Sequence, residues 1–508
     1  MPESMKFAMR SIFSLLLLTA GAVTTAAHPL DATAPAHLIA RPAALAPGIG
    51  RETLPLPAAG RSRAARELHA QGLAQLHAYR WIEAARAFRT ALRIEDDLLV
   101  AHLGLVRSYE AMKDRAGADA ALARAEPHGA AASERDRALF EAFRLRRAAD
   151  TPGPQGAQAH EAYRAALDRL IAQHPADIEL LLLRGNAAES VAWGKGMAGH
   201  GEALPFYERA VERAPQHAGA RHYLAHTQEN LGNHFEAATH AAWFARLAPR
   251  APHARHMYGH TLPRLGKWDQ AIEEFEAAAA LEEEYHRGEG IPARMDWHHV
   301  HNLNLLGLAY LRVGRTDDAE RTLARAFRTG IPDPQTITWH SIWPEYLIHA
   351  DRAPEAEAAA RTLTTSEHPV LRVAGHTLAG EAALSAGDSA RARSALDAAR
   401  AQRADWQLQA SLHPMGAAFG YLLDDQLALL EERLAFAAAP EDPATQAALL
   451  ARAEQFERQP GFDAWGSGWL RTLRLEADAR RHGEVALADR LATLAGGVPQ
   501  APPSDATR

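Results

Sequence analysis

The sequence predicts an all-α fold in which helical hairpins stack into a solenoid. Alanine, leucine, arginine and glutamate dominate residues 64–497, and these residue types favour helices. No stretch alternates apolar and polar residues at a period of two, so strands are not expected. Breaks such as Asn230-Leu231-Gly232 recur roughly every 14 to 20 residues, a spacing that suits one helix and its turn.

The N-terminal residues 1–27 have the pattern of a secretory signal. Lys6 and Arg10 give a positive start, an apolar run follows, and small residues precede His28. The apolar run from Ile12 to Val23 is shorter than the ~20 residues that a membrane-spanning helix needs. We therefore expect an exported protein, periplasmic or secreted, with no membrane span after removal of the signal.

Proline-rich segments flank the expected solenoid, which we place at residues 64–497. Residues 28–63 contain six prolines, which exclude a continuous helix, so we expect a linker or an extended arm. The tail, residues 498–508, contains three prolines, and we expect it to be disordered.

Composition and missing motifs exclude several classes of function. The net charge is -7, so there is no basic footprint for nucleic acid. The chain has no cysteine, which excludes disulfides, thiolate metal sites and covalent haem attachment. Nucleotide-binding glycine loops, a nucleophile elbow and His-Glu-x2-His are also missing. No nucleotide or haem is indicated, and any metal would need histidine, carboxylate or water ligands.

Within residues 64–497, a glycine on an expected first helix recurs with an alanine and a larger apolar residue on the second. The matches are Gly72 with Ala84 and Phe88, Gly259 with Ala271 and Phe275, Leu306-Gly307-x2-Tyr310 with Ala319, and Gly380 with Ala392 and Leu396. Pro215 and Pro249 close successive units 34 residues apart. The pattern resembles that of tetratricopeptide repeat (TPR) proteins, whose unit is ~34 residues long. The resemblance implies a right-handed superhelix of about ten hairpins whose first helices line a concave groove.

Two histidine pairs lie one repeat apart. His222 and His226 are four residues apart, as are His256 and His260, and each member of the second pair follows its counterpart by 34 residues. Residues at i and i+4 share one helix face and can bind one cation together. Packed helices have axes ~8–10 Å apart, so the four imidazoles could meet at one ion.

Further polar residues share this helix face when the units are aligned on the residue that closes each first helix. His253 and His301 occupy one position, and could form a second site or complete the first. Asn304, Glu345 and Glu381 fall at the positions of the histidine pairs in later units, so we regard them as candidate ligand-binding residues. The resemblance to TPR proteins implies that this face lines the inner groove.

Carboxylates and a histidine-rich helix start complete the candidate site. Glu229, one turn after His226, and Glu189 in the preceding unit could orient a ligating imidazole or be ligands themselves. Four imidazoles suit Zn²⁺ or Cu²⁺, whereas an added carboxylate suits Fe²⁺ or Mn²⁺ better. Asp296 is a natural helix N-cap, and His298 in the following turn could bind an anionic group or add a ligand. The alternative for that turn is a capped helix start with solvated histidines.

Three phrases resemble those of a histidine-rich group of exported bacterial TPR proteins. They are His222-Tyr-Leu-x-His226, Pro252-His-Ala-x-His-Met257 and Asp296-Trp-His-x2-His-Asn302. We expect a concave His/Glu-lined groove that binds a ligand through a divalent transition metal, Zn, Cu or Fe. A metal-free groove for a protein or peptide of the cell envelope, a metalloenzyme of unknown substrate, and histidines that merely pack between helices remain as alternatives.

Overall fold

The computed structural model describes residues 36–57, 60–151, 153–191, 198–330, 337–410, 416–458 and 464–496. Within these ranges the regular structure is helical and no strand occurs, as the composition predicted. The helices from α2 to α23 follow one another as eleven successive pairs, in line with the expected ten or so hairpins.

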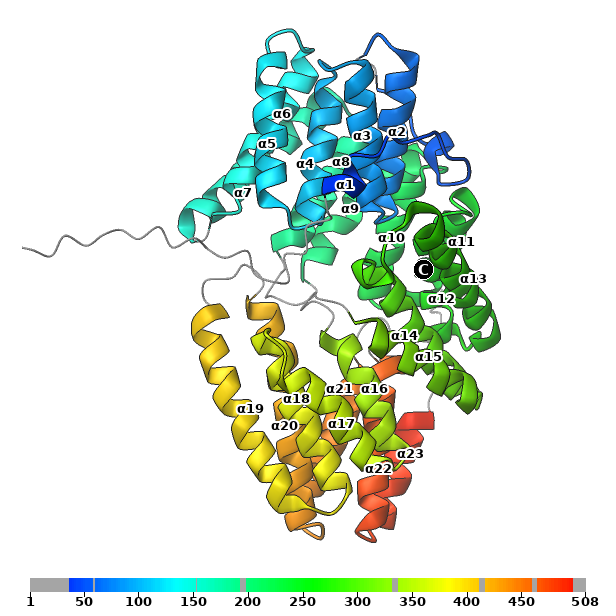
Figure 1. Cartoon of the computed structure of the whole chain (residues 1–508), viewed down its shortest axis with the longest axis vertical. Helices are drawn as coiled ribbons and strands as arrows, with labels where there is room; N and C mark the ends of the chain where they lie inside the picture. The colour runs from blue at the N-terminus through cyan, green and yellow to red at the C-terminus, as the bar shows by residue number, and fades with distance from the viewer. Residues whose placement is uncertain are drawn as a thin grey trace, which may run out of the picture.

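The helices fall into three groups along the long axis of the molecule (Figure 1). The first group contains α1 (Ala36–Ile39), α2 (Arg63–His77), α3 (Trp81–Ile94), α4 (Leu99–Ala111), α5 (Arg115–Ala125), α6 (Glu134–Ala148), α7 (Pro154–Gln173), α8 (Ile178–Val191) and α9 (Ala198–Arg213). The second contains α10 (Ala218–Asn230), α11 (His234–Leu247), α12 (Pro252–Thr261), α13 (Trp268–Glu289), α14 (Trp297–Arg312) and α15 (Thr316–Thr329). The third contains α16 (Ile337–His349), α17 (Ala353–Thr364), α18 (Pro369–Ser385), α19 (Ser389–Ala410), α20 (Gly416–Ala438), α21 (Pro443–Glu457), α22 (Trp469–Arg481) and α23 (Val485–Gly496).

Small residues on the first helices allow close packing against the second helices. A Cβ atom added to Gly72 on α2 would lie 2.6 Å from the ring of Phe88 on α3. The same atom on Gly259 would lie 3.0 Å from the ring of Phe275. Because real Cβ atoms do not approach so closely without displacement, these glycines are needed for the observed helix spacing. The predicted TPR-type pattern of glycine and aromatic residue is confirmed, and the chain is a TPR-like solenoid.

The first hairpin, α2–α3, packs back onto helices that follow it by well over a hundred residues. Helix α2 contacts α10, and the Trp81 ring on α3 stacks on the Trp297 ring of α14 with 5.8 Å between their centroids. The hydroxyl of Tyr285 on α13 donates a 2.7 Å hydrogen bond to Glu83 on α3. The superhelix is therefore closed at this turn, and α2–α3 covers the inner face of α10, α12 and α14.

The segment that we expected to be a linker or an extended arm lies against the solenoid over residues 36–57. Leu38, Ile39 and Ile49 are buried in the core that continues into the first hairpin. The Gly48 carbonyl accepts a 2.8 Å hydrogen bond from the backbone N–H of Arg250, just before α12. This segment therefore helps to hold the first hairpin against the second group of helices.

Local features near the histidines agree with the sequence. Helix α12 ends at Thr261, and a 3₁₀ turn over Pro263–Leu265 replaces its continuation just after His260. The Asp296 side chain caps α14 by accepting from the backbone N–H of His299, as predicted.

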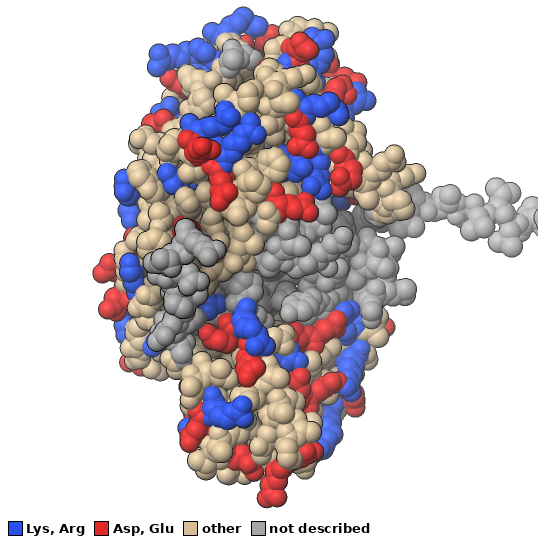
Figure 2. Space-filling model, turned by 180° about the vertical axis from the view of Figure 1, so that it is seen from behind, with Lys and Arg blue, Asp and Glu red and all other residues tan. Residues whose placement is uncertain are grey.

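None of the described helices combines the length and apolar character needed to cross a bilayer. On the described part of the face in Figure 2, Lys and Arg are interspersed with Asp and Glu.

Candidate metal centre

Six of the predicted histidines form two groups of three, which we call triad 1 and triad 2. Triad 1 is His222 and His226 from α10 with His253 from α12, and triad 2 is His256 and His260 from α12 with His301 from α14. Within each triad the three ligand-capable atoms lie within 4.8 Å of one another. The structure therefore groups the two histidine pairs into separate triads, where we had expected the pairs to meet at one ion.

The two triads share one construction, which explains this difference. Each takes its i and i+4 pair from one first helix and its third histidine from the start of the next first helix. The residue opposite the His222 pair is His253, three residues nearer the N-terminus than His256, which is the counterpart of His222. Neighbouring first helices are thus displaced along their axes, and a pair meets the position before the next pair.

The histidines lie in the interior of the closed turn. His222 is 0% exposed and His256 is 1% exposed. The ring of Tyr79, in the turn between α2 and α3, lies 4.8 Å from the His222 ring and 4.5 Å from the His253 ring, centroid to centroid. The concave face that we expected to be an open groove is therefore covered here by the first hairpin.

Tyr79 itself is held in an unusual backbone conformation. Its φ is 58°, in the left-handed region that costs a non-glycine residue roughly 1–2 kcal/mol. Sequence analysis missed Tyr79 because the TPR pattern gives this turn no functional position. The sequence did offer one indication of a role for Tyr79, namely an aromatic residue in a turn that requires a positive φ.

Three of the six histidines have Nδ1 bound to an oxygen acceptor. The contacts are 2.6 Å from His222 to the carbonyl oxygen of His77, 3.0 Å from His256 to Oδ1 of Asn302, and 2.6 Å from His260 to Oε1 of Glu229. An acceptor at Nδ1 fixes the proton there and leaves the lone pair on Nε2. This is the arrangement by which metal-binding histidines are usually oriented.

The acceptors are themselves held in place. Asn302 donates through Nδ2 to the carbonyl oxygen of Phe275 at 2.9 Å, which directs Oδ1 toward His256. The pKa of Glu229 is lowered overall: burial opposes ionisation, but His260 outweighs it. Glu229, a predicted site residue, therefore lies where it orients His260 as a carboxylate.

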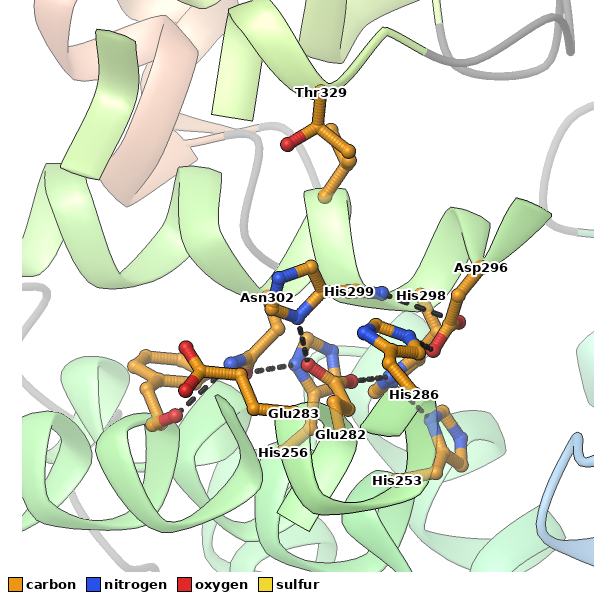
Figure 3. Close-up of polar contacts among 12 residues, drawn as sticks. His253, His256, Glu282, Glu283, His286, Asp296, His298, His299, Asn302 and Thr329 are labelled. Atoms are coloured by element: carbon orange, nitrogen blue, oxygen red, sulfur yellow. Dashed lines mark hydrogen bonds and ion pairs between the residues drawn. The ribbon is translucent and has the colours of Figure 1, made fainter. Parts of the chain in front are cut away.

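The carboxylate of Glu282, which sequence analysis missed, orients the ring of His298. Nδ1 of His298 lies 2.5 Å from Oε1 of Glu282, and Nδ1 of His299 lies 2.7 Å from Oε2 of the same carboxylate (Figure 3). Glu282 is 1% exposed, although it belongs to the run Glu282-Glu283-Glu284. A run of glutamates on a helix usually indicates a solvated face, so the sequence carried no sign of this contact.

His253 lies between the Nε2 atoms of two other imidazoles. Its Nε2 is 2.8 Å from Nε2 of His222, and its Nδ1 is 2.6 Å from Nε2 of His298. Both neighbours carry a proton on Nδ1, because those atoms face oxygen acceptors. When all three rings are neutral, His253 has one N–H and can satisfy only one of the two contacts. In that state the other contact brings two lone pairs together.

Protonation of His253 itself does not relieve this conflict at neutral pH. Burial, reinforced by the neighbouring histidines, lowers the pKa of His253 well below its ordinary value of 6.5. The pKa values of His222, His256 and His301 are lowered in the same way, chiefly by burial. These four rings are therefore neutral at pH 7, the form in which imidazole binds metals.

The other predicted site residues lie outside the triads. Glu189 accepts hydrogen bonds from the hydroxyls of Tyr207 at 3.0 Å and Thr227 at 3.1 Å. Asn304 donates to the carbonyl oxygen of Val300 within its own helix at 3.0 Å.

Glu345 and Glu381 belong to a buried ion-pair cluster in the third group of helices. Glu345 is 3.0 Å from Arg471, and Glu381 is 2.5 Å from Arg474 and 3.2 Å from Arg433. All five side chains are buried. The arginines come from α20 and α22, so the inner face of this half is filled by its own helices.

Comparisons with known proteins give the fold alone. The chain matches no family model and no curated protein. Among solved structures it is similar to a tetratricopeptide repeat protein from Parabacteroides merdae (13% identity, 56% of this chain and 98% of that chain, TM-score 0.39). It is also similar to yeast Tom70 (11% identity, 85% and 92%, TM-score 0.40) and to human IFIT1 solved as a dimer with m7Gppp-AAAA (14% identity, 88% and 94%, TM-score 0.42).

Proposed function

We propose that this chain is an exported TPR-like protein that binds a transition-metal ion at the cluster formed by the two triads and His298. The observation that carries the proposal is the position of His253 between the Nε2 atoms of His222 and His298. A cation bound at these nitrogens replaces the repulsion between lone pairs with coordination. Export rests on the N-terminal signal pattern.

The surroundings of the cluster support this assignment. Imidazole nitrogen suits zinc, copper and iron. The Nδ1 contacts of His222, His256 and His260 would fix each ring before an ion arrives, which limits the entropy lost on binding. Three protein ligands per ion also leave a coordination position for water or a small molecule, as in catalytic metal sites. A metalloenzyme therefore stays compatible with the proposal, although no substrate is indicated.

Elemental analysis of the full chain, purified from the export compartment without added metal, tests the proposal. We expect at least one equivalent of a transition metal per chain, and its loss in His253→Ala. The control is His376→Ala on α18, a half-buried histidine outside both triads. Helicity measured by circular dichroism must be unchanged in both variants. Metal-free wild type whose melting temperature does not respond to added zinc, copper or iron would overturn the proposal.

Protein binding is a second candidate function, which the TPR-like fold suggests. The inner face is covered at the histidines and filled with arginines further along, so a partner would bind the outer surface. Phe235, at the start of α11, is 70% exposed there. Capture of an envelope protein by wild type but not by Phe235→Ser would support this candidate, and equal capture by both would count against that surface.

A further inference from the structure

The two triads have the same arrangement in successive repeat units. Each unit supplies a histidine pair on its first helix, and the start of the next first helix supplies the third ligand. A further site of this kind would need histidines at 304, 308 and 338, where the chain has Asn304, Leu308 and Thr338. A site one step earlier would need its third ligand at 219, where the chain has Gly219. The histidine pattern therefore gives two such sites, and the units before and after them lack the histidines for another.

Each triad has its own hydrogen-bond partners that orient its histidines. Triad 1 is oriented through His222 and the His77 carbonyl, whereas triad 2 is oriented through Asn302 and Glu229. Neither triad includes a carboxylate among its ligand atoms, so each offers three imidazole nitrogens.

One imidazole lies between the two sites. The His298 ring centroid is 4.5 Å from that of His253 in triad 1 and 4.5 Å from that of His256 in triad 2. Its Nδ1 is fixed by Glu282, so its Nε2 faces the triads. His298 therefore connects the two sites through a single ring.

We propose that the chain holds two transition-metal ions, one in each triad, with His298 between them. This inference rests on the proposed function, since it concerns the same histidines. It adds a number of ions and a separate place for each, which metal binding alone does not require.

Anaerobic titration with copper(I), in competition with bathocuproine disulfonate, measures the number of ions directly. Wild type should bind two per chain. His226→Ala, which changes triad 1, and His260→Ala, which changes triad 2, should each bind one. The double variant should bind none, and His376→Ala should bind two. Circular dichroism checks the fold, and His226→Asn with His260→Asn replace the alanine variants if either fails to fold.

The outcomes separate this inference from the proposed function. A single ion lost equally in both single variants would overturn the two-site inference and leave metal binding intact. Absence of any bound metal would overturn the proposed function as well.

Magnetic resonance gives a second readout that depends on both ions being close. After oxidation of the loaded protein with ferricyanide, wild type should show a copper(II) spectrum broadened or weakened by spin–spin interaction. His226→Ala and His260→Ala should each show the sharp spectrum of one isolated ion. Identical sharp spectra in wild type and variants would contradict neighbouring sites.

Discussion

His222 and His77 are joined by a 2.6 Å hydrogen bond between the imidazole Nδ1 of the first and the backbone carbonyl oxygen of the second. His77 is the last residue of α2, and its own ring is fixed by Glu179 at 2.8 Å and by the Tyr223 hydroxyl at 3.1 Å. A ligand of triad 1 is thereby attached to the hairpin that covers it. Occupation of the site and docking of α2–α3 should consequently be coupled.

We predict that metal stabilises the docked first hairpin. Amide hydrogen exchange in α2 and α3 should slow on loading, whereas exchange in α19, in the third group, should not change. At a free metal concentration of 100 times Kd, the protein should gain about 2.7 kcal/mol in its free energy of unfolding for each occupied site. Equal protection of α2–α3 with and without metal would contradict the coupling.

Glu229→Gln should weaken metal binding at triad 2 by about 10- to 100-fold, because the amide orients His260 without a negative charge. Chelator competition measures the affinity. Glu283→Gln is the matched control: Glu283 on α13 pairs with Arg325 near the surface and should leave the affinity unchanged. A similar loss in both variants would indicate a general electrostatic effect and no specific role for Glu229.

Tyr79→Asn should speed the loss of metal from triad 1 to a chelator. Asparagine tolerates a positive φ, so the turn is kept while the ring over His222 and His253 is removed. Lys113 lies 34 residues later, has φ 62° and is exposed, which makes Lys113→Asn a control for the turn. We expect at least a tenfold faster release in Tyr79→Asn alone; unchanged release would show that the ring does not limit exchange.

The metal-free protein should lose stability as the pH falls below 6.5. Burial lowers the pKa values of His222, His253, His256 and His301 in the folded state, while unfolded histidines keep a pKa near 6.5. The unfolded state then binds more protons, so the contribution is complete above pH 6.5 and decreases toward the folded-state values.

Urea unfolding at pH 5 and pH 7 checks this dependence. Each such histidine should contribute up to about 1.4 kcal/mol per pH unit, and His253→Gln should reduce the slope by one histidine's share. A free energy of unfolding that does not vary over this range would contradict neutral burial of the rings.

Arg433→Met should destabilise the third group of helices by about 3–5 kcal/mol, because it leaves buried carboxylates without their partner. Arg433 is 1% exposed and pairs with Asp478 at 2.7 Å and Glu381 at 3.2 Å. Arg63→Met, in an exposed pair with Glu67, should have little effect. Urea unfolding measures both, and metal content should stay at the wild-type level in each.

The repeat period predicted the hairpins and the helix face that carries the histidines, because both depend on regular spacing along the chain. Gly72 with Phe88 and His222 with His226 follow from spacing alone. His222 meets His253, three residues before its predicted counterpart His256. The closure of the turn could not be predicted in this way. Tyr79, the His77 carbonyl and the buried Glu282 reach the cluster through long-range contacts that have no period.

The same limit explains Glu345 and Glu381. They occupy the positions of His226 and His260 in later units, and on that basis alone a ligand role was reasonable. Their partners Arg433, Arg471 and Arg474 come from helices that fold back onto this face. Sequence spacing shows which side chains share a face, but not which later helix will cover it.

The position of α2–α3 over the histidines also affects the compartment in which the protein acquires an ion. Tyr79 and the first hairpin lie over the histidines, so an ion should enter the finished molecule more slowly than a chain that is still assembling. The identity of the bound metal would then reflect the ions available in the compartment in which folding finishes, as well as the intrinsic preference of the imidazoles.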